Sequence, residues 1–134
     1  MTRQENKLQM SLLLIRLTVF LVMFMWTLDK FINPEHAARV YEKFYFIADL
    51  DNPVMYVIGS VELVVLLLFV VGYMKKYSYG AVLFFHAIST LSSFKQYVNP
   101  FEGANLLFFA AWPMLAACLA LFMLRHSDKK LSVR

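Results

Sequence analysis

Residues 104–124 read ANLLFFAAWPMLAACLALFML, a run of apolar side chains that contains no charged residue. A helix rises about 1.5 Å per residue, so about 20 residues cross the roughly 30 Å of hydrocarbon in a lipid bilayer. Backbone polar groups cannot stay unpaired in lipid, and a run of this length therefore predicts a membrane-spanning helix rather than a strand.

Three further runs of similar length and character lie at about residues 8–31, 54–74 and 77–98. The chain is 60% hydrophobic and only 16% charged, which excludes a soluble enzyme domain and a disordered tail. We therefore predict an all-α fold with residues 1–134 as one domain: an integral membrane antiparallel four-helix bundle.

The loop between the first two runs predicts a short amphipathic helix over about residues 34–48. Pro34 suits the first position of a helix, and Asn33 before it suits a cap. Val40, Phe44 and Ile47 then recur at helical spacing. We expect this helix to lie on the outer membrane surface or to cap the bundle.

The distribution of lysine and arginine predicts the orientation of the chain. Eight of these residues lie in the N-terminal segment, the second loop and the C-terminal tail, and four lie on the opposite side. Cytoplasmic loops are richer in lysine and arginine, so we expect both termini in the cytoplasm. Because the basic residues are scattered rather than gathered on one face, we expect a lipid bilayer as partner and no nucleic acid.

Three ionisable side chains, Arg16, Glu62 and His86, fall inside the predicted spans. Such a group costs about 2.5–3.5 kcal/mol at the centre of a spanning helix on insertion scales, so each needs a partner, water or an escape to the interface. The three lie at similar depths, which predicts a polar core with an Arg16–Glu62 ion pair and His86 beside it. The alternatives are that Arg16 snorkels to the cytoplasmic headgroups, that His86 hydrogen-bonds a neighbouring helix, and that a neutral Glu62 only links helices.

Hydroxyl residues extend this predicted polar core along the third run. Ser89, Thr90 and Ser93 follow His86 at offsets of three, four and seven, on one helical face. We count them as candidate ligand-binding residues, although small hydroxyl residues also serve close helix packing.

A second polar group lies near the outer helix ends and forms a candidate outer mouth. Its members are Asp29, Lys30, Lys95 and Asn105. Charges at helix ends also act as solvated anchors, which is the alternative for this group.

Metal ligands and cofactor motifs are sparse in the sequence. It has no C-x-x-C and no H-x-x-x-H pattern, and its one cysteine, Cys118, lies in an apolar run. Metal and haem sites need several ligands at one place, so we expect no metal and no intrinsic cofactor.

Taken in order, four features resemble the DoxX family of small four-helix bacterial membrane proteins: Arg16 early in the first helix, Lys30-Phe31 at its end, the stretch Gly59-Ser60-Val61-Glu62-Leu63, and Asn105-Leu106-Leu107. The resemblance covers about residues 12–124. The family often has glycine where Thr27 stands here. The resemblance implies a bacterial inner membrane and a link to thiol, sulfur or quinone redox chemistry, with Arg16, Lys30 and Glu62 as pattern positions.

We therefore expect an accessory subunit of an inner-membrane redox system, which holds a quinone, a lipid-like molecule or a partner at its polar core. Such a chain is not expected to be an enzyme on its own, but a subunit beside an oxidoreductase. One alternative is a non-enzymatic scaffold or assembly factor whose outer helix binds a periplasmic partner. Another is a small carrier, for which a homo-oligomer would be needed because four helices seldom enclose a path.

Overall fold

All regular structure in residues 2–133, the part of the chain that the computed structural model describes, is helical. The elements are α1 (Arg3–Ile32), α2 (Pro34–Tyr45), α3 (Asn52–Val70), α4 (Lys75–Ser92), α5 (Phe94–Val98), the 3-10 helix η1 (Asn105–Ala110), α6 (Ala111–Met123) and the 3-10 helix η2 (Arg125–Ser127). The all-α prediction is therefore confirmed.

Three helical segments of the described chain are long and apolar enough to cross a membrane: α1, α3, and η1 continued by α6. The predicted third span, residues 77–98, is different because it is two helices, α4 and α5, with a break at Ser93. Side-chain hydroxyls explain the break. Ser92 donates to the carbonyl of Ser89 at 2.7 Å and Tyr97 donates to the carbonyl of Thr90 at 2.8 Å, so hydroxyls compete for carbonyls that a continuous helix would use.

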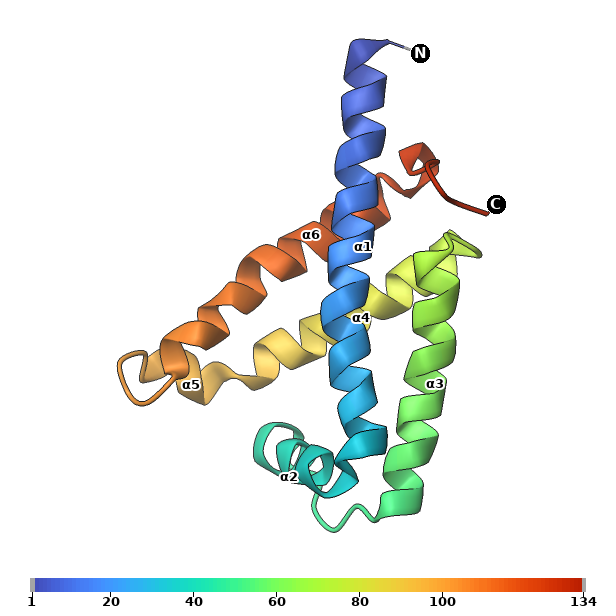
Figure 1. Cartoon of the computed structure of the whole chain (residues 1–134). Helices are drawn as coiled ribbons and strands as arrows, with labels where there is room; N and C mark the ends of the chain where they lie inside the picture. The colour runs from blue at the N-terminus through green and yellow to red at the C-terminus, as the bar shows by residue number, and fades with distance from the viewer. Residues whose placement is uncertain (1, 134) are drawn as a thin grey trace.

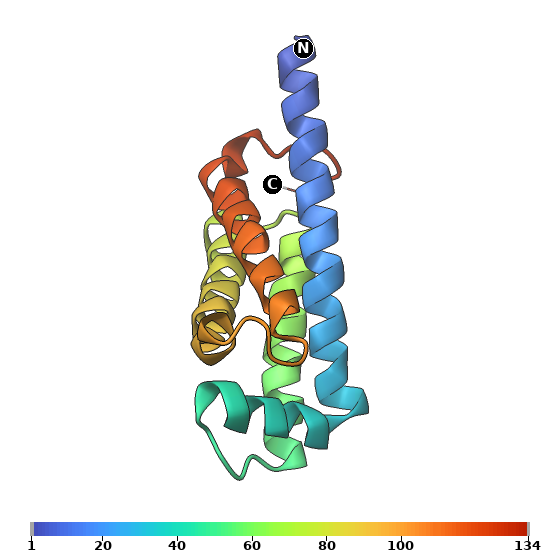
Figure 2. The ribbon, with the colours of Figure 1, turned by 90° about the vertical axis from the view of Figure 1, so that its left-hand side faces the viewer.

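The long helices form two antiparallel pairs. α1 packs mainly against α3, and α4 packs mainly against α6. The α4–α6 pair runs obliquely across the α1–α3 pair (Figure 1). The C-terminal segment and the turn between α3 and α4 lie at one end of the molecule, which we call the tail end. The opposite end holds α2, and we call it the α2 end (Figure 2).

The buried apolar core lies in the tail half of the molecule, where all four long helices meet. Its members are Leu12, Val19, Met23, Leu66, Phe69, Tyr79, Val82, Cys118 and Leu121. Large apolar side chains also cover the outside, among them Leu14, Leu21, Val57 and Val64, each more than half exposed. An apolar exterior of this kind fits contact with lipid.

A glycine brings α3 close to α1 near the α2 end. A Cβ atom added to Gly59 would lie 2.9 Å from the ring of Phe31 and 3.3 Å from Cβ of Lys30. Thr27 is buried at this end of α1 with 3% of its surface exposed. The close approach thus depends on the glycine of α3 and tolerates threonine at position 27 of α1.

The predicted amphipathic helix is present as α2, but it ends at Tyr45 rather than near residue 48. Phe46 adopts the left-handed conformation with φ of 61°, which stops the helix. Asn33 precedes Pro34 but makes no capping hydrogen bond through its side chain. α2 lies across the end of the bundle (Figure 2).

Candidate functional site

The expected ion pair between Arg16 and Glu62 is wrong, because Arg16 belongs to the tail end. Its side chain is fully buried, and Nη1 lies 2.9 Å from Oδ1 of Asp128. Nη2 donates to the carbonyls of Lys130 and Leu131 at 2.5 and 2.9 Å. The C-terminal tail folds back after α6 and supplies all of these partners. The apolar runs of the sequence do not indicate this contact, because the tail lies outside them.

Asp128 is held in turn by two other helices, and we call Arg16, Tyr79 and Asp128 the tail cluster. The hydroxyl of Tyr79 donates to Oδ2 of Asp128 at 2.6 Å, and the ammonium of Lys75 donates to its carbonyl. Further along the tail, the N–H of Val133 donates to the carbonyl of Val71 at 2.7 Å. In the sequence, Asp128 is the one acid in a C-terminal tail whose basic residues indicate only orientation. No sequence signal therefore identifies it as the partner of Arg16.

Glu62 pairs with Lys30, which we had assigned to the outer mouth. Their atoms Oε1 and Nζ lie 2.7 Å apart, and the side chains are 19% and 8% exposed. Lys30 also lies over the ring of Tyr41, with Nζ 5.4 Å from the centroid. Arg16 precedes Lys30 in α1 by 14 residues, or roughly 21 Å of helix, which places it far from this pair.

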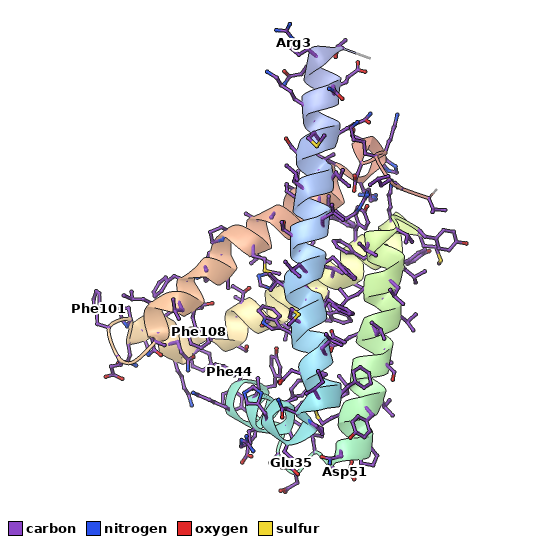
Figure 3. The ribbon with its side chains drawn as sticks, viewed as in Figure 1. Arg3, Glu35, Phe44, Asp51, Phe101 and Phe108 are labelled. Atoms are coloured by element: carbon purple, nitrogen blue, oxygen red, sulfur yellow. The ribbon has the colours of Figure 1, made fainter. Side chains whose placement is uncertain are left out.

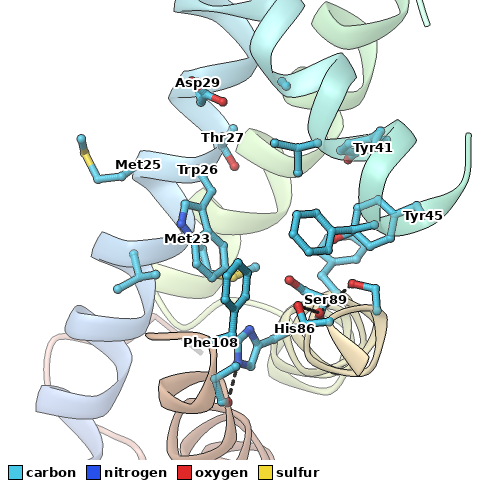
Figure 4. Close-up of a pocket in the computed structure, with 18 of the residues that line it drawn as sticks. Met23, Met25, Trp26, Thr27, Asp29, Tyr41, Tyr45, His86, Ser89 and Phe108 are labelled. Carbon is cyan, nitrogen blue, oxygen red and sulfur yellow. Dashed lines mark hydrogen bonds between the residues drawn. The ribbon is translucent and has the colours of Figure 1, made fainter. Parts of the chain in front are cut away.

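A cavity of 960 Å³ lies at the α2 end, between α1, α2, α3, α4 and the start of α6 (Figure 4). Ligand sites for small molecules span about 300–1,000 Å³. Much of the wall is apolar or aromatic, with Val22, Met23, Met25, Trp26, Val40, Phe44, Phe85, Leu107, Phe108 and Met114. The polar lining consists of Thr27, Asp29, Lys30, His36, Tyr41, Tyr45, Glu62, His86, Ser89, Ser92 and Ser93.

The cavity brings together parts of both predicted polar groups. From the polar core it contains Glu62, His86, Ser89 and Ser93, and from the outer mouth it contains Asp29 and Lys30. Arg16, Thr90, Lys95 and Asn105 do not line it.

The residues that stay outside the cavity have other partners. The hydroxyl of Thr90 donates to the carbonyl of His86 at 2.7 Å, inside its own helix. Lys95 lies over the ring of Phe46 at 5.2 Å, and Asn105 donates through its side-chain amide to the carbonyl of Asn99 at 2.8 Å. These contacts give the residues structural roles.

His86 is the most deeply buried ionisable residue of the cavity wall, with 1% of its surface exposed. Its Nε2 lies 3.0 Å from the carbonyl oxygen of Ala111. A carbonyl can only accept, so Nε2 carries the proton of this bond. The ring is stacked on Trp26 with a centroid distance of 6.1 Å, and Nδ1 has no hydrogen-bond partner in the described part of the chain.

α2 forms a roof over the cavity. Ala37, Val40, Tyr41 and Phe44 line the cavity from above. Phe44 lies 5.7 Å from Phe108 of η1, centroid to centroid, and so connects the roof to the second helix pair (Figure 3).

Polar contacts join the roof to α1, and burial affects one hydroxyl of the roof. Asp29 pairs with His36 across 2.7 Å and ties the end of α1 to the start of α2. Burial raises the pKa of the Tyr41 hydroxyl, and the negative charge of Glu62 raises that pKa further. Tyr41 is therefore a neutral hydroxyl next to the Lys30–Glu62 pair.

Within residues 2–133, no group of three or more His, Cys, Asp or Glu side chains is arranged to hold a metal ion. Comparisons with protein-family models, with curated proteins and with solved structures find no match for this chain. The resemblance to the DoxX family therefore stays a prediction.

Proposed function

We propose that the chain is a multi-pass protein of a bacterial inner membrane that holds a lipid-soluble ligand in the cavity below α2. In this proposal it serves as accessory subunit of a thiol, sulfur or quinone-linked redox system. α4 with α5 makes the fourth crossing of an antiparallel four-helix bundle, and both termini face the cytoplasm. The observation that carries the proposal is the cavity itself, which combines aromatic walls with grouped polar side chains.

Access from the lipid supports an apolar ligand. Met25 of α1 and Leu107 of η1 both line the cavity, yet they are 56% and 76% exposed. The cavity therefore reaches the outer surface between α1 and η1, where lipid would surround the helices. A molecule dissolved in the bilayer could enter sideways there, with its polar part directed toward the roof.

The redox part of the proposal depends on the family resemblance. Cys118 is 3% exposed and packs in the core of the tail half, outside the cavity. Electron transfer would therefore belong to the bound molecule or to a partner protein. A quinone is the candidate ligand because its flat ring suits the aromatic walls and its tail suits lipid.

Tryptophan fluorescence tests whether the cavity binds such a ligand. A Trp112→Phe variant leaves Trp26, in the cavity wall, as the single tryptophan. In detergent solution, decylubiquinone or its reduced form should quench Trp26 in a saturable manner. Quenching that rises linearly with the concentration of both the oxidised and the reduced form, without saturation, would contradict binding at this site.

A cavity-filling variant provides the specificity control. Ser89→Phe places a ring in the cavity and should weaken binding at least about tenfold, because the ligand loses the space that it occupies. Ser60→Phe makes the same change on an exposed face of α3 outside the cavity, and should leave binding unchanged. Equal affinities of the two variants would refute the assignment of the site.

In cells, Glu62→Gln should lower the associated redox activity at a normal protein level.

The exposed face of α2 favours the scaffold as second candidate. Glu35, Arg39, Glu42 and Lys43 are exposed on the helix that forms the roof, where a periplasmic partner could bind. Charge reversal at Glu42 and Lys43 would then release a partner in crosslinking experiments, whereas Glu62→Gln would not. The opposite pattern favours the ligand-binding function.

A further inference from the structure

We infer that the ligand is anchored by an uncharged ring hydroxyl group that donates a hydrogen bond to Nδ1 of His86, with the ring lying among the aromatic side chains of the cavity. The chemical class is therefore a phenol or hydroquinone with an apolar tail. This inference rests on the proposed function and adds the chemistry of the headgroup.

The position of the proton on His86 makes Nδ1 an acceptor. Nε2 must donate to the carbonyl of Ala111, as argued from their 3.0 Å separation, so the neutral ring has its lone pair on Nδ1. Figure 4 shows one ring nitrogen at the dashed bond to the backbone and the other turned away from that bond. A buried acceptor left without a donor costs free energy, and a ligand donor removes that cost.

The charged side chains of the cavity wall pair with one another and not with His86. Glu62 is paired with Lys30 at 2.7 Å, and Asp29 is paired with His36 at 2.7 Å. His86 forms no ion pair within residues 2–133, so no carboxylate of the wall holds it as an imidazolium. A carboxylate or phosphate would bring a further acceptor toward Nδ1 and would repel it. A hydroxyl group is the uncharged donor that meets both conditions.

The walls beside His86 favour a flat ring around that hydroxyl. Trp26 lies parallel to the imidazole within 22°, and Phe108 approaches the same region with Phe44 beside it. Aromatic rings gain both apolar burial and stacking contacts in such surroundings. Nδ1 is itself buried, so a ring that packs against Trp26 or Phe108 brings its hydroxyl to Nδ1 only if the neighbouring side chains shift.

A matched pair of probes tests the donor directly: para-nonylphenol and its methyl ether, which has the same ring and tail but no O–H. Both are titrated into the Trp112→Phe chain, with quenching of Trp26 as readout. The phenol should bind about tenfold more tightly, relative to its detergent partitioning, and tenfold corresponds to about 1.4 kcal/mol. That is the size expected for a hydrogen bond to a buried neutral group.

His86→Phe supplies the reference in which the acceptor is gone and a ring remains. In His86→Phe the phenol and the ether should bind with about equal affinity. Dividing the phenol-to-ether affinity ratio of the Trp112→Phe chain by the ratio of the His86→Phe variant removes the effect of detergent partitioning. If His86→Phe does not fold because it loses the bond to Ala111, Ser89→Phe with its filled cavity gives the same partitioning reference.

The outcomes separate the two proposals. Equal, saturable binding of phenol and ether by the wild-type cavity overturns the hydroxyl inference and leaves the ligand-binding function standing. Binding of neither probe also overturns the inference, and if decylubiquinone and its reduced form do not bind either, the proposed function fails with it.

Discussion

At the tail end, the fully buried Arg16 and Asp128 form an ion pair, and only Nε of the guanidinium lacks a hydrogen-bond partner, whereas at the α2 end the Lys30–Glu62 pair stays partly exposed and Nδ1 of His86 has no partner among the described residues. Buried polar groups are almost always hydrogen-bonded, so an unpaired one needs an explanation. The two ends differ because the charges of the tail cluster pair within the chain and away from the cavity, whereas His86 lies in the cavity wall, where a ligand could supply the missing partner.

The largest effect is expected from breaking the tail cluster. Asp128→Ala leaves the guanidinium of Arg16 buried without its counterion, and should lower the free energy of unfolding by about 3–5 kcal/mol. Unfolding of the purified protein in detergent, followed by circular dichroism, measures the loss. Lys129→Ala changes the neighbouring exposed residue and should have almost no effect. An Asp128→Ala protein as stable as the wild type would remove the contrast between the ends.

A smaller loss is expected at the α2 end. Glu62→Gln removes one charge of a pair whose side chains are 19% and 8% exposed, and its amide oxygen can still accept from Lys30. We expect a loss of about 1 kcal/mol, close to the values of exposed pairs. The same unfolding measurement applies, with Glu102→Gln in an exposed loop as control. A loss as large as that of Asp128→Ala would mean that the Lys30–Glu62 pair is as strongly shielded from water as the Arg16–Asp128 pair.

The smallest effect concerns the titration of Tyr41. Its pKa is raised by burial and by Glu62, so its hydroxyl should ionise above the ordinary tyrosine pKa of about 10. The folded state holds this proton more tightly than the unfolded state. The resulting stability is complete below the ordinary tyrosine pKa of about 10 and is lost as pH rises above it.

Phenolate absorbance of the wild type minus that of Tyr41→Phe isolates this titration. Because Glu62 is one cause of the shift, Glu62→Gln should lower the pKa of Tyr41 toward the ordinary value. If Tyr41 ionises at the ordinary tyrosine pKa of about 10, or if its pKa does not respond to the change at Glu62, the roof is open to water.

Features that depend on a single segment were predictable from the sequence. The apolar runs gave α1, α3 and the η1–α6 segment because length and composition alone decide whether a helix can cross a membrane. Pro34 and the spacing of Val40 and Phe44 gave α2. The break of the third run was not foreseen, since it depends on hydroxyl bonds around Ser93 that hydropathy does not register.

The candidate site was only partly predictable because depth along a helix does not define which helices face each other. Equal depth suggested that Arg16 meets Glu62, but α1 presents Lys30 to Glu62 and a folded-back tail covers Arg16. His86, Ser89 and Glu62 do share one cavity, which the predicted polar core had grouped. The role of Trp26 beside His86 needed the three-dimensional arrangement, because the two belong to different helices.

The tail cluster also constrains the order in which the protein can mature. Arg16 lies in α1, whereas Asp128 is translated 112 residues later. At about 5–20 residues per second, this cation waits on the order of 10 s for its counterion. During that interval the cation needs water or another partner, so α1 reaches its final packing only after Asp128 has been translated.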